Sequence, residues 1–134
     1  MLKLRAASLF LMLIAFGMSL AWADAPQPYS DKTFEKLQAA GAPIVVFVHA
    51  DWCPVCQVQK PIVDEFASSK PYGNVKVLMV DFDKQKEVLR KFDVQRQSTL
   101  IAYHNGKEVG RQVGITQKDL IEFLFRRATG QGGS

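Results

Sequence analysis

An apolar run and the cysteine segment that follows it constrain the fold of this chain more than any other feature. Ile44 to Val48 is a stretch of five apolar residues, four of them β-branched. Such a run is typical of a strand buried on both faces of a sheet. It leads within four residues into Trp52-Cys53-Pro54-Val55-Cys56, which holds the only two cysteines of the chain. We therefore expect a central strand that ends in a turn carrying both cysteines.

A helix is expected to begin inside the cysteine segment, because Pro54 suits the first turn of a helix. Apolar residues then recur at spacings of three and four, which predicts one apolar face made of Val55, Val58, Ile62 and Phe66. Pro61 falls inside this helix and is expected to kink it. Cys53 would lie at the helix N-terminus, where unpaired N–H groups and the helix dipole favour a thiolate, and Cys56 would lie one turn further on.

The chain on either side of this unit predicts further strands and helices. Two prolines between Asp24 and Tyr29 allow only a poor or edge strand there. Ser30 or Asp31 can cap a helix that ends at Gly41 and turns two apolar residues inward, Phe34 and Leu37. Val75 to Val80 predicts a second buried strand, and a short helix follows with Val88, Leu89 and Phe92.

The last third of the chain predicts a hairpin and a final helix. Asn105-Gly106 between Thr99–Tyr103 and Glu108–Val113 is a strong hairpin signal. Thr116 and Asp119 resemble a capping box, and the helix after them would carry Leu120, Ile121, Leu124 and Phe125. Parallel strands joined by helices and closed by an antiparallel hairpin predict an α/β fold with a central mixed sheet flanked by helices. The cysteines would lie at the carboxyl end of the first central strand.

The first 23 residues have the pattern of a secretory signal peptide. Lys3 and Arg5 precede an apolar stretch from Ala6 to Leu20, and Ala21-Trp22-Ala23 supplies a small-x-small cleavage site. The alternative is an uncleaved membrane anchor, for which the stretch is short. Removal of the leader would place a domain from 24 to 129 and a flexible tail from 130 to 134 in the periplasm of a bacterium. Disulfides persist in that compartment.

Two cysteines three positions apart admit three kinds of chemistry. A redox-active pair could exchange disulfides with other proteins. A fixed structural disulfide closing so short a loop would stabilise the fold by at most about 2 kcal/mol, which is little for a domain with its own core. A metal or iron–sulfur site needs further ligands, because two cysteines and His49 fall short of the four that zinc takes. Gln57 directly after Cys56 excludes covalent haem attachment.

Taken together, the motifs resemble those of the thioredoxin family. In order along Ser30 to Phe125, they are Ala50-Asp51-Trp52-Cys53-x-x-Cys56, Pro61, Asp81-Phe82-Asp83, Thr99-Leu100, Asn105-Gly106-Lys107 and Val113-Gly114. The resemblance implies a single thioredoxin-fold domain, with Cys53 as the attacking nucleophile and Cys56 as the resolving thiol. Six further residues are candidates for supporting the site or binding substrate, namely Trp52, Pro54, Val55, Ser98, Thr99 and His49.

Three departures from the family bear on the chemistry. The family has a cis-proline directly before the Thr-Leu pair and uses the backbone beside it to hold substrate, but here the position is Ser98. A cis bond before a residue other than proline costs about 2.5–4 kcal/mol, so we expect the Gln97–Ser98 bond to be trans. The buried acid of the family and its lysine partner correspond to Phe47 and Met79, so Cys56 needs another base or water to lose its proton.

His49 is the third departure, because the family has an aromatic residue at this position. The histidine could shuttle the proton of the resolving step or favour the thiolate as a cation. It could equally be a histidine satisfied by a backbone partner at a strand end.

The resemblance implies protein thiols and disulfides as partners, and it is compatible with a membrane disulfide reductase or oxidase. No cofactor and no metal are expected. Removing Lys3 and Arg5 lowers the small formal charge of +4 further, and no basic stripe interleaved with aromatic residues is present, so nucleic acid is excluded as a partner. A monomer is expected, in contact with a membrane only if the leader stays uncleaved. A binding or chaperone module with a passive disulfide stays open beside the oxidoreductase.

Overall fold

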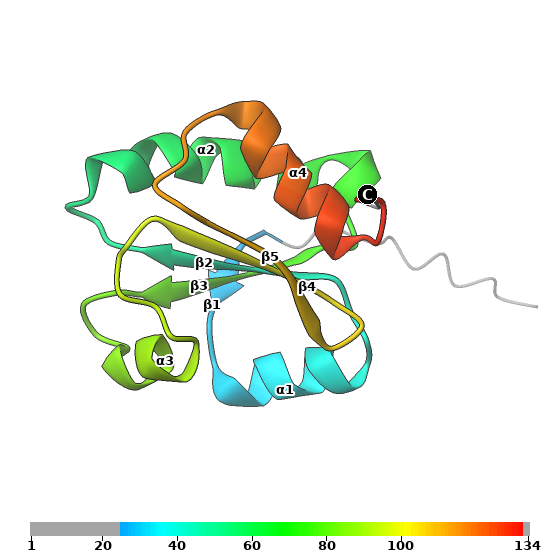
Figure 1. The fold of residues 1–134 in the computed structure, drawn as a ribbon, viewed down its shortest axis with the longest axis horizontal. Helices are drawn as coiled ribbons and strands as arrows, with labels where there is room; N and C mark the ends of the chain where they lie inside the picture. The colour runs from blue at the N-terminus through cyan, green and yellow to red at the C-terminus, as the bar shows by residue number, and fades with distance from the viewer. Residues whose placement is uncertain (1–24, 133–134) are drawn as a thin grey trace, which may run out of the picture.

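A five-stranded mixed sheet forms the middle of the molecule (Figure 1). The computed structural model describes residues 25–132, so the predicted signal peptide at 1–23 and the last two residues of the predicted tail lie outside it. The strands are β1 (Gln27–Pro28), β2 (Ile44–His49), β3 (Lys76–Asp81), β4 (Thr99–His104) and β5 (Lys107–Val113). Their order in the sheet is β1-β3-β2-β4-β5. Strand β3 pairs in parallel with β1 and β2, whereas β4 is antiparallel to β2 and β5.

Helices cover both faces of this sheet. They are α1 (Asp31–Ala39), α2 (Pro54–Ser68), α3 (Lys86–Lys91) and α4 (Lys118–Ala128), with a 3₁₀ turn at Lys70–Tyr72. Figure 1 shows α2 and α4 on one face and α1 and α3 on the other. Among the described residues, no helix combines the length and the apolar content needed to cross a membrane. The predicted α/β architecture with a central mixed sheet is therefore confirmed.

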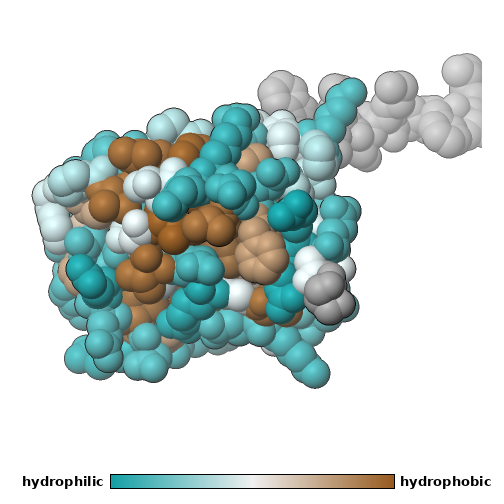
Figure 2. Space-filling view, turned by 45° about the horizontal axis from the view of Figure 1, so that its top comes forward, coloured by the Kyte–Doolittle hydropathy of each residue, from teal (hydrophilic) through white to brown (hydrophobic). Residues whose placement is uncertain are grey.

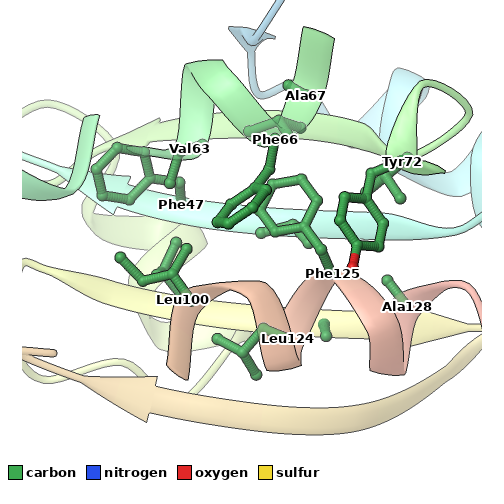
Figure 3. Close-up of a cluster of buried hydrophobic side chains, with 14 of the residues drawn as sticks. Phe47, Val63, Phe66, Ala67, Tyr72, Leu100, Leu124, Phe125 and Ala128 are labelled. Atoms are coloured by element: carbon green, nitrogen blue, oxygen red, sulfur yellow. The ribbon is translucent and has the colours of Figure 1, made fainter. Parts of the chain in front are cut away.

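Strand β2 is buried on both faces, as its apolar run predicted. Successive side chains of a strand point to opposite faces, and the two cores follow this alternation. Val45 and Phe47 pack in the core beneath α2 and α4. Ile44, Val46 and Val48 pack in the core beneath α1 and α3. Figure 3 shows Phe47 in the first core, with side chains from α2 and α4 converging on the sheet.

Two short sequence signals mark the ends of elements where we predicted them. The Ser30 side chain accepts a hydrogen bond from the Thr33 N–H and caps α1. Asn105 and Gly106 join β4 to β5 with φ angles of 48° and 78°, the left-handed conformation that a two-residue hairpin turn requires. The predicted edge strand near the N-terminus is β1, which contains Pro28 at the border of the sheet.

The predicted apolar face of α2 is partly wrong. The side chains buried along this helix are Cys56, Gln59, Val63, Phe66 and Ala67. Val58 is instead 48% exposed, because the buried positions follow Cys56 at three- and four-residue steps and place Val58 on the outer side. Figure 2, in which the α2–α4 layer is turned forward, shows apolar side chains gathered on that outer surface.

The start of α4 also differs from the prediction. Gln117 is the N-cap residue and makes no side-chain capping bond, so Thr116 and Asp119 form no capping box. Ile121, Leu124 and Phe125 are buried as predicted, but Leu120 is 38% exposed. The first turn of α4 therefore lies at the rim, and the helix enters the core only from Ile121 onward.

Candidate active site

The turn between β2 and α2 places Cys53 at the start of the helix. Cys53 is the N-cap residue of α2, and its sulfur accepts a hydrogen bond from the Cys56 N–H at 3.1 Å. Its own N–H donates to the Ala50 carbonyl oxygen, also at 3.1 Å, which closes the turn. Pro54 occupies the first turn of the helix, where its missing N–H costs nothing. The Cys53 sulfur thus receives an N–H at the positive end of the helix dipole.

Both cysteines are free thiols and both are buried. Burial raises the pKa of Cys56 to about 11, and hydrogen bonding to the Cys53 side chain adds to the rise. Hydrogen bonding to the backbone of Ala50 and of Ser98 acts in the opposite direction on the same pKa. Cys56 is therefore a protonated thiol at neutral pH, held between the turn of Cys53 and the segment before β4.

Trp52 stands out from the surface beside the cysteine turn, 58% exposed. Its indole Nε1–H donates to Asp83 Oδ2 at 2.9 Å, and its ring lies edge-on to Phe82 with centroids 6.3 Å apart. Sequence reasoning did not assign Phe82 and Asp83 to the site, although the Asp81-Phe82-Asp83 motif was available. The indole is held in one orientation and is available for contact with a partner protein.

Ser98 lies directly before β4, as expected for a site residue, and the Gln97–Ser98 bond is trans because the described residues contain no cis peptide bond. Its φ is 60°, a left-handed conformation that is uncommon for residues other than glycine. The Ser98 N–H donates to the Val48 carbonyl oxygen at 2.9 Å, a bond that proline could not make. The Ser98 hydroxyl bonds to the Gln97 carbonyl oxygen, and the Thr99 hydroxyl bonds to the Arg96 carbonyl oxygen.

Gln59 is a site residue that sequence reasoning missed. Its side chain is fully buried one turn after Cys56 on α2. Its Nε2 group donates to the Ser98 carbonyl oxygen at 3.2 Å and to the Ile115 carbonyl oxygen at 2.8 Å. The available signal was a polar residue, three positions after Cys56, on what proves to be the buried side of the helix.

His49 ends β2 and is 9% exposed. Its Nδ1 lies 3.7 Å from Asp51 Oδ1, and its Nε2 is buried without a hydrogen-bond partner among the described residues. Within the part of the chain that the structure describes, the backbone partner that we considered for this ring is not found. Its ring meets Phe47 edge-on at 5.4 Å between centroids.

A cavity of about 280 Å³ lies beside this strand end, lined among others by His49, Asp51, Met79, Asp81 and Asp83. Phe47 pairs with Met79 in the register of β2 and β3. The apolar replacements of the family's acid and lysine thus lie next to one another at the expected place.

The remaining predicted residues have modest roles. Val55 is half-buried and packs against the core beneath α2, so it brings no charge to the sulfurs. Within residues 25–132, no group of three or more histidine, cysteine, aspartate or glutamate side chains is arranged to hold a metal ion. The metal and iron–sulfur alternative therefore gains no support from the arrangement of side chains.

Comparison with known proteins gives consistent matches. The family model named Thioredoxin matches residues 26–126. A thioredoxin of Chlamydia muridarum is 36% identical over 101 residues, which is 75% of this chain and 96% of the relative. A thioredoxin of Rickettsia bellii is 31% identical over 97 residues, which is 71% of this chain and 91% of the relative.

Solved structures agree with these matches. The crystal structure of Trxlp from Edwardsiella tarda superposes with a TM-score of 0.70 at 45% identity, covering 72% of this chain and 95% of that one. A thioredoxin mutant from Halobacterium salinarum has the same TM-score at 20% identity and shows the shared fold.

Proposed function

This chain belongs to the thioredoxin family, and we propose that it is a periplasmic thiol–disulfide oxidoreductase that exchanges disulfides with protein partners through Cys53 and Cys56. The observation that carries the proposal is the geometry of the cysteine turn. Cys53 lies at the N-terminus of α2 with the Cys56 N–H on its sulfur, and Cys56 lies one turn behind it. The match to the Thioredoxin family supports the disulfide-exchange reaction. The signal-peptide pattern of residues 1–23 supports the periplasmic location.

The reaction that this geometry performs has two balanced steps. The Cys53 thiolate attacks one sulfur of a partner disulfide, which forms a mixed disulfide and releases the partner's other sulfur as a thiolate. Cys56 then gives up its proton, and its thiolate attacks the Cys53 sulfur and releases the partner's second sulfur. At the end of the reaction Cys53 and Cys56 form a disulfide, and the partner has gained two electrons. The reverse sequence oxidises a partner dithiol.

The pKa of about 11 for Cys56 separates the roles of the two thiols. A buried thiol that keeps its proton at neutral pH is a poor attacking group, whereas a thiolate at a helix N-terminus is a good one. Cys56 therefore acts after the mixed disulfide has formed, when its proton can pass to water or to the departing thiolate.

A direct test is an insulin-reduction and dithiol-oxidation assay of the unmodified protein and of two variants. Cys53→Ser should abolish turnover in both directions because it removes the nucleophile. Cys56→Ser should stop turnover but accumulate mixed disulfides, because it removes only the resolving thiol. Equal rates for the unmodified protein and Cys53→Ser would contradict the proposal. Binding of an unfolded client by a protein with unreactive Cys53 would favour the passive binding module instead.

The same variants test the partners, which we propose to be protein thiols and disulfides and a membrane disulfide reductase or oxidase. Cys56→Ser expressed with its leader should form disulfide-linked adducts that disappear on reduction. Cys53→Ser/Cys56→Ser is the matched control and should form none. Adducts of equal amount in both strains would show that the capture does not depend on Cys53.

A further inference from the structure

The Gln59 side chain links three segments that surround the resolving cysteine. It projects from α2 on the buried side that also carries Cys56. Its two hydrogen bonds reach the carbonyl oxygens of Ser98, before β4, and of Ile115, after β5. These carbonyls belong to loops 39 and 56 residues away along the chain. A single buried amide thus joins the redox helix to the loops at the adjoining end of the hairpin.

The segment held by this amide is strained and lies beside the reaction. Ser98 keeps a φ of 60°, a left-handed conformation that is strained for a residue with a side chain. Its carbonyl oxygen accepts from the Gly114 N–H at 3.0 Å as well as from Gln59, and its N–H donates to Val48. The backbone of Ser98 also acts to lower the pKa of the Cys56 thiol, against the larger effect of burial. Without these bonds, Ser98 would relax toward the common negative φ values.

The neighbouring residue Gln97 is the part of this segment that a partner can reach. Gln97 is half-buried, and its backbone N–H has no acceptor among the described residues. A free backbone N–H just outside the end of a strand can donate to an extended segment of another protein. Gln97 directly precedes Ser98, so its N–H lies in the short segment that the bonds of Ser98 to Val48 and Gln59 anchor at the start of β4.

We propose that Gln59 is a positioning residue for the docking of partner proteins, because its carboxamide fixes the Ser98 carbonyl oxygen in the segment that carries the Gln97 N–H. The inference rests on the disulfide exchange at Cys53 proposed above. In this chain, the Gln59 side chain would hold the loop in which the Gln97–Ser98 peptide bond is trans. A partner would then bind a segment whose conformation depends on Gln59, a residue that the partner does not contact.

The chemistry of the two acceptors explains why a glutamine suits this position. Both partners are carbonyl oxygens, so the side chain must supply two donors, and the NH₂ of a primary amide does so. A glutamate carboxylate would place negative oxygens against both carbonyls. A leucine of similar size would leave both carbonyls without this donor.

The test separates docking from chemistry in one set of assays. Gln59→Leu should raise the KM for insulin about tenfold, the equivalent of about 1.4 kcal/mol of lost docking. The kcat should stay within about threefold. The rate with Ellman's reagent, a small disulfide, should stay within about twofold, because this reagent reacts without docking on the Gln97 segment. Gln38→Leu is the matched control, because Gln38 is a half-buried glutamine on α1 across the sheet. It should leave both KM and the reagent rate unchanged.

The possible outcomes distinguish the inference from the function beneath it. An unchanged insulin KM in Gln59→Leu overturns the positioning role while the oxidoreductase stands. An equal loss with insulin and with Ellman's reagent also overturns it, because Gln59 would then act on the cysteines themselves. No reaction with either substrate in the unmodified protein refutes the proposed function instead.

A conservative variant and a measurement on the unmodified protein cover the case in which Gln59→Leu fails to fold. In Gln59→Glu, the buried carboxyl can donate one hydrogen bond only when protonated, so its insulin KM should approach that of the unmodified protein as the pH falls from 8 to about 5.5. A KM ratio that does not change with pH contradicts the inference. By NMR, the Gln59 side-chain amide protons should exchange about 100-fold more slowly than those of exposed Gln57. Equal exchange would show that the amide is not held.

Discussion

At the scale of single residues, the buried thiol of Cys56 makes the stability of the reduced protein depend on pH. Its pKa is raised from an ordinary value near 9 to about 11, chiefly by burial. The folded state therefore holds this proton more tightly than the unfolded chain. The stability that results is complete below about pH 9 and is lost as the pH rises toward 11.

We therefore expect the free energy of unfolding of the reduced protein to fall between pH 9 and 11, with a slope of up to about 1.4 kcal/mol per pH unit. Urea unfolding under reducing conditions at several pH values measures it. Cys56→Ser should show a shallower loss, because it keeps the tyrosines, including Tyr103 with a pKa raised to about 12, but lacks the thiol. Parallel curves for the two proteins would count against a buried, protonated Cys56.

The candidate thiols were easier to find in the sequence than the residues that hold them in place. Cys53, Cys56 and Ser98 were identifiable because their spacing and order match a family pattern. Gln59 was not, since its partners are backbone carbonyls of distant loops, and any residue type can supply a carbonyl. The missing partner of His49 was equally unpredictable, because it depends on which loops pass the end of β2.

At the scale of elements, the packing of α4 on β5 depends on a residue without a side chain. An added Cβ at Gly110 would lie 2.9 Å from Leu124 Cδ2. Leu124 is 1% exposed, so its side chain could move aside only within the core. The close approach of helix and strand therefore requires glycine at this position.

Gly110→Ala should destabilise the protein by about 1–3 kcal/mol through overpacking, measured by urea unfolding. Gly114→Ala is the informative comparison, because Gly114 has a φ of 71° but nothing within 4 Å of an added Cβ. It should cost about 1 kcal/mol, through backbone strain alone. A Gly110→Ala variant as stable as the unmodified protein would mean that α4 can shift away from β5 without loss.

Helices and strands were predicted correctly where the signal depends only on residues that are close in sequence. The run in β2, the Ser30 cap and the Asn105-Gly106 turn each depend on neighbouring residues, and each was confirmed. The inward face of α2 was harder, because its polar and thiol positions are buried while Val58 is exposed. Hydrophobicity alone could not identify a helix face that includes Gln59 and Cys56.

At the scale of the whole molecule, the proposal of a periplasmic protein depends on the first 23 residues. A positive start, an apolar stretch and Ala21-Trp22-Ala23 predict export followed by cleavage. When the full chain is expressed in a Gram-negative bacterium, we expect the protein in the fraction released by osmotic shock, with Asp24 at its N-terminus. Intact-mass measurement and N-terminal sequencing check both points. An uncleaved chain in the membrane fraction would support the anchor instead.

The two cores of the molecule share one sheet, so the redox turn and the far face are mechanically joined. Alternate residues of β2 contribute to both cores, and β2 leads straight into the cysteine turn. This explains how a turn with few bonds of its own can keep Cys53 and Cys56 in place. The buried strand β2 therefore fixes the position of the cysteine turn.

The Ser98 N–H bond to Val48 has a consequence for how this sequence can change. A Ser98→Pro substitution would remove that donor and would require a φ near −65° where the chain has 60°. The clamp from Gln59 is built on the present conformation, so it would oppose the change rather than ease it. Return to the family's proline therefore requires concerted replacements, and the effect of each depends on the others. In evolutionary terms, the effect of proline at position 98 is epistatic, because it depends on the side chain at position 59.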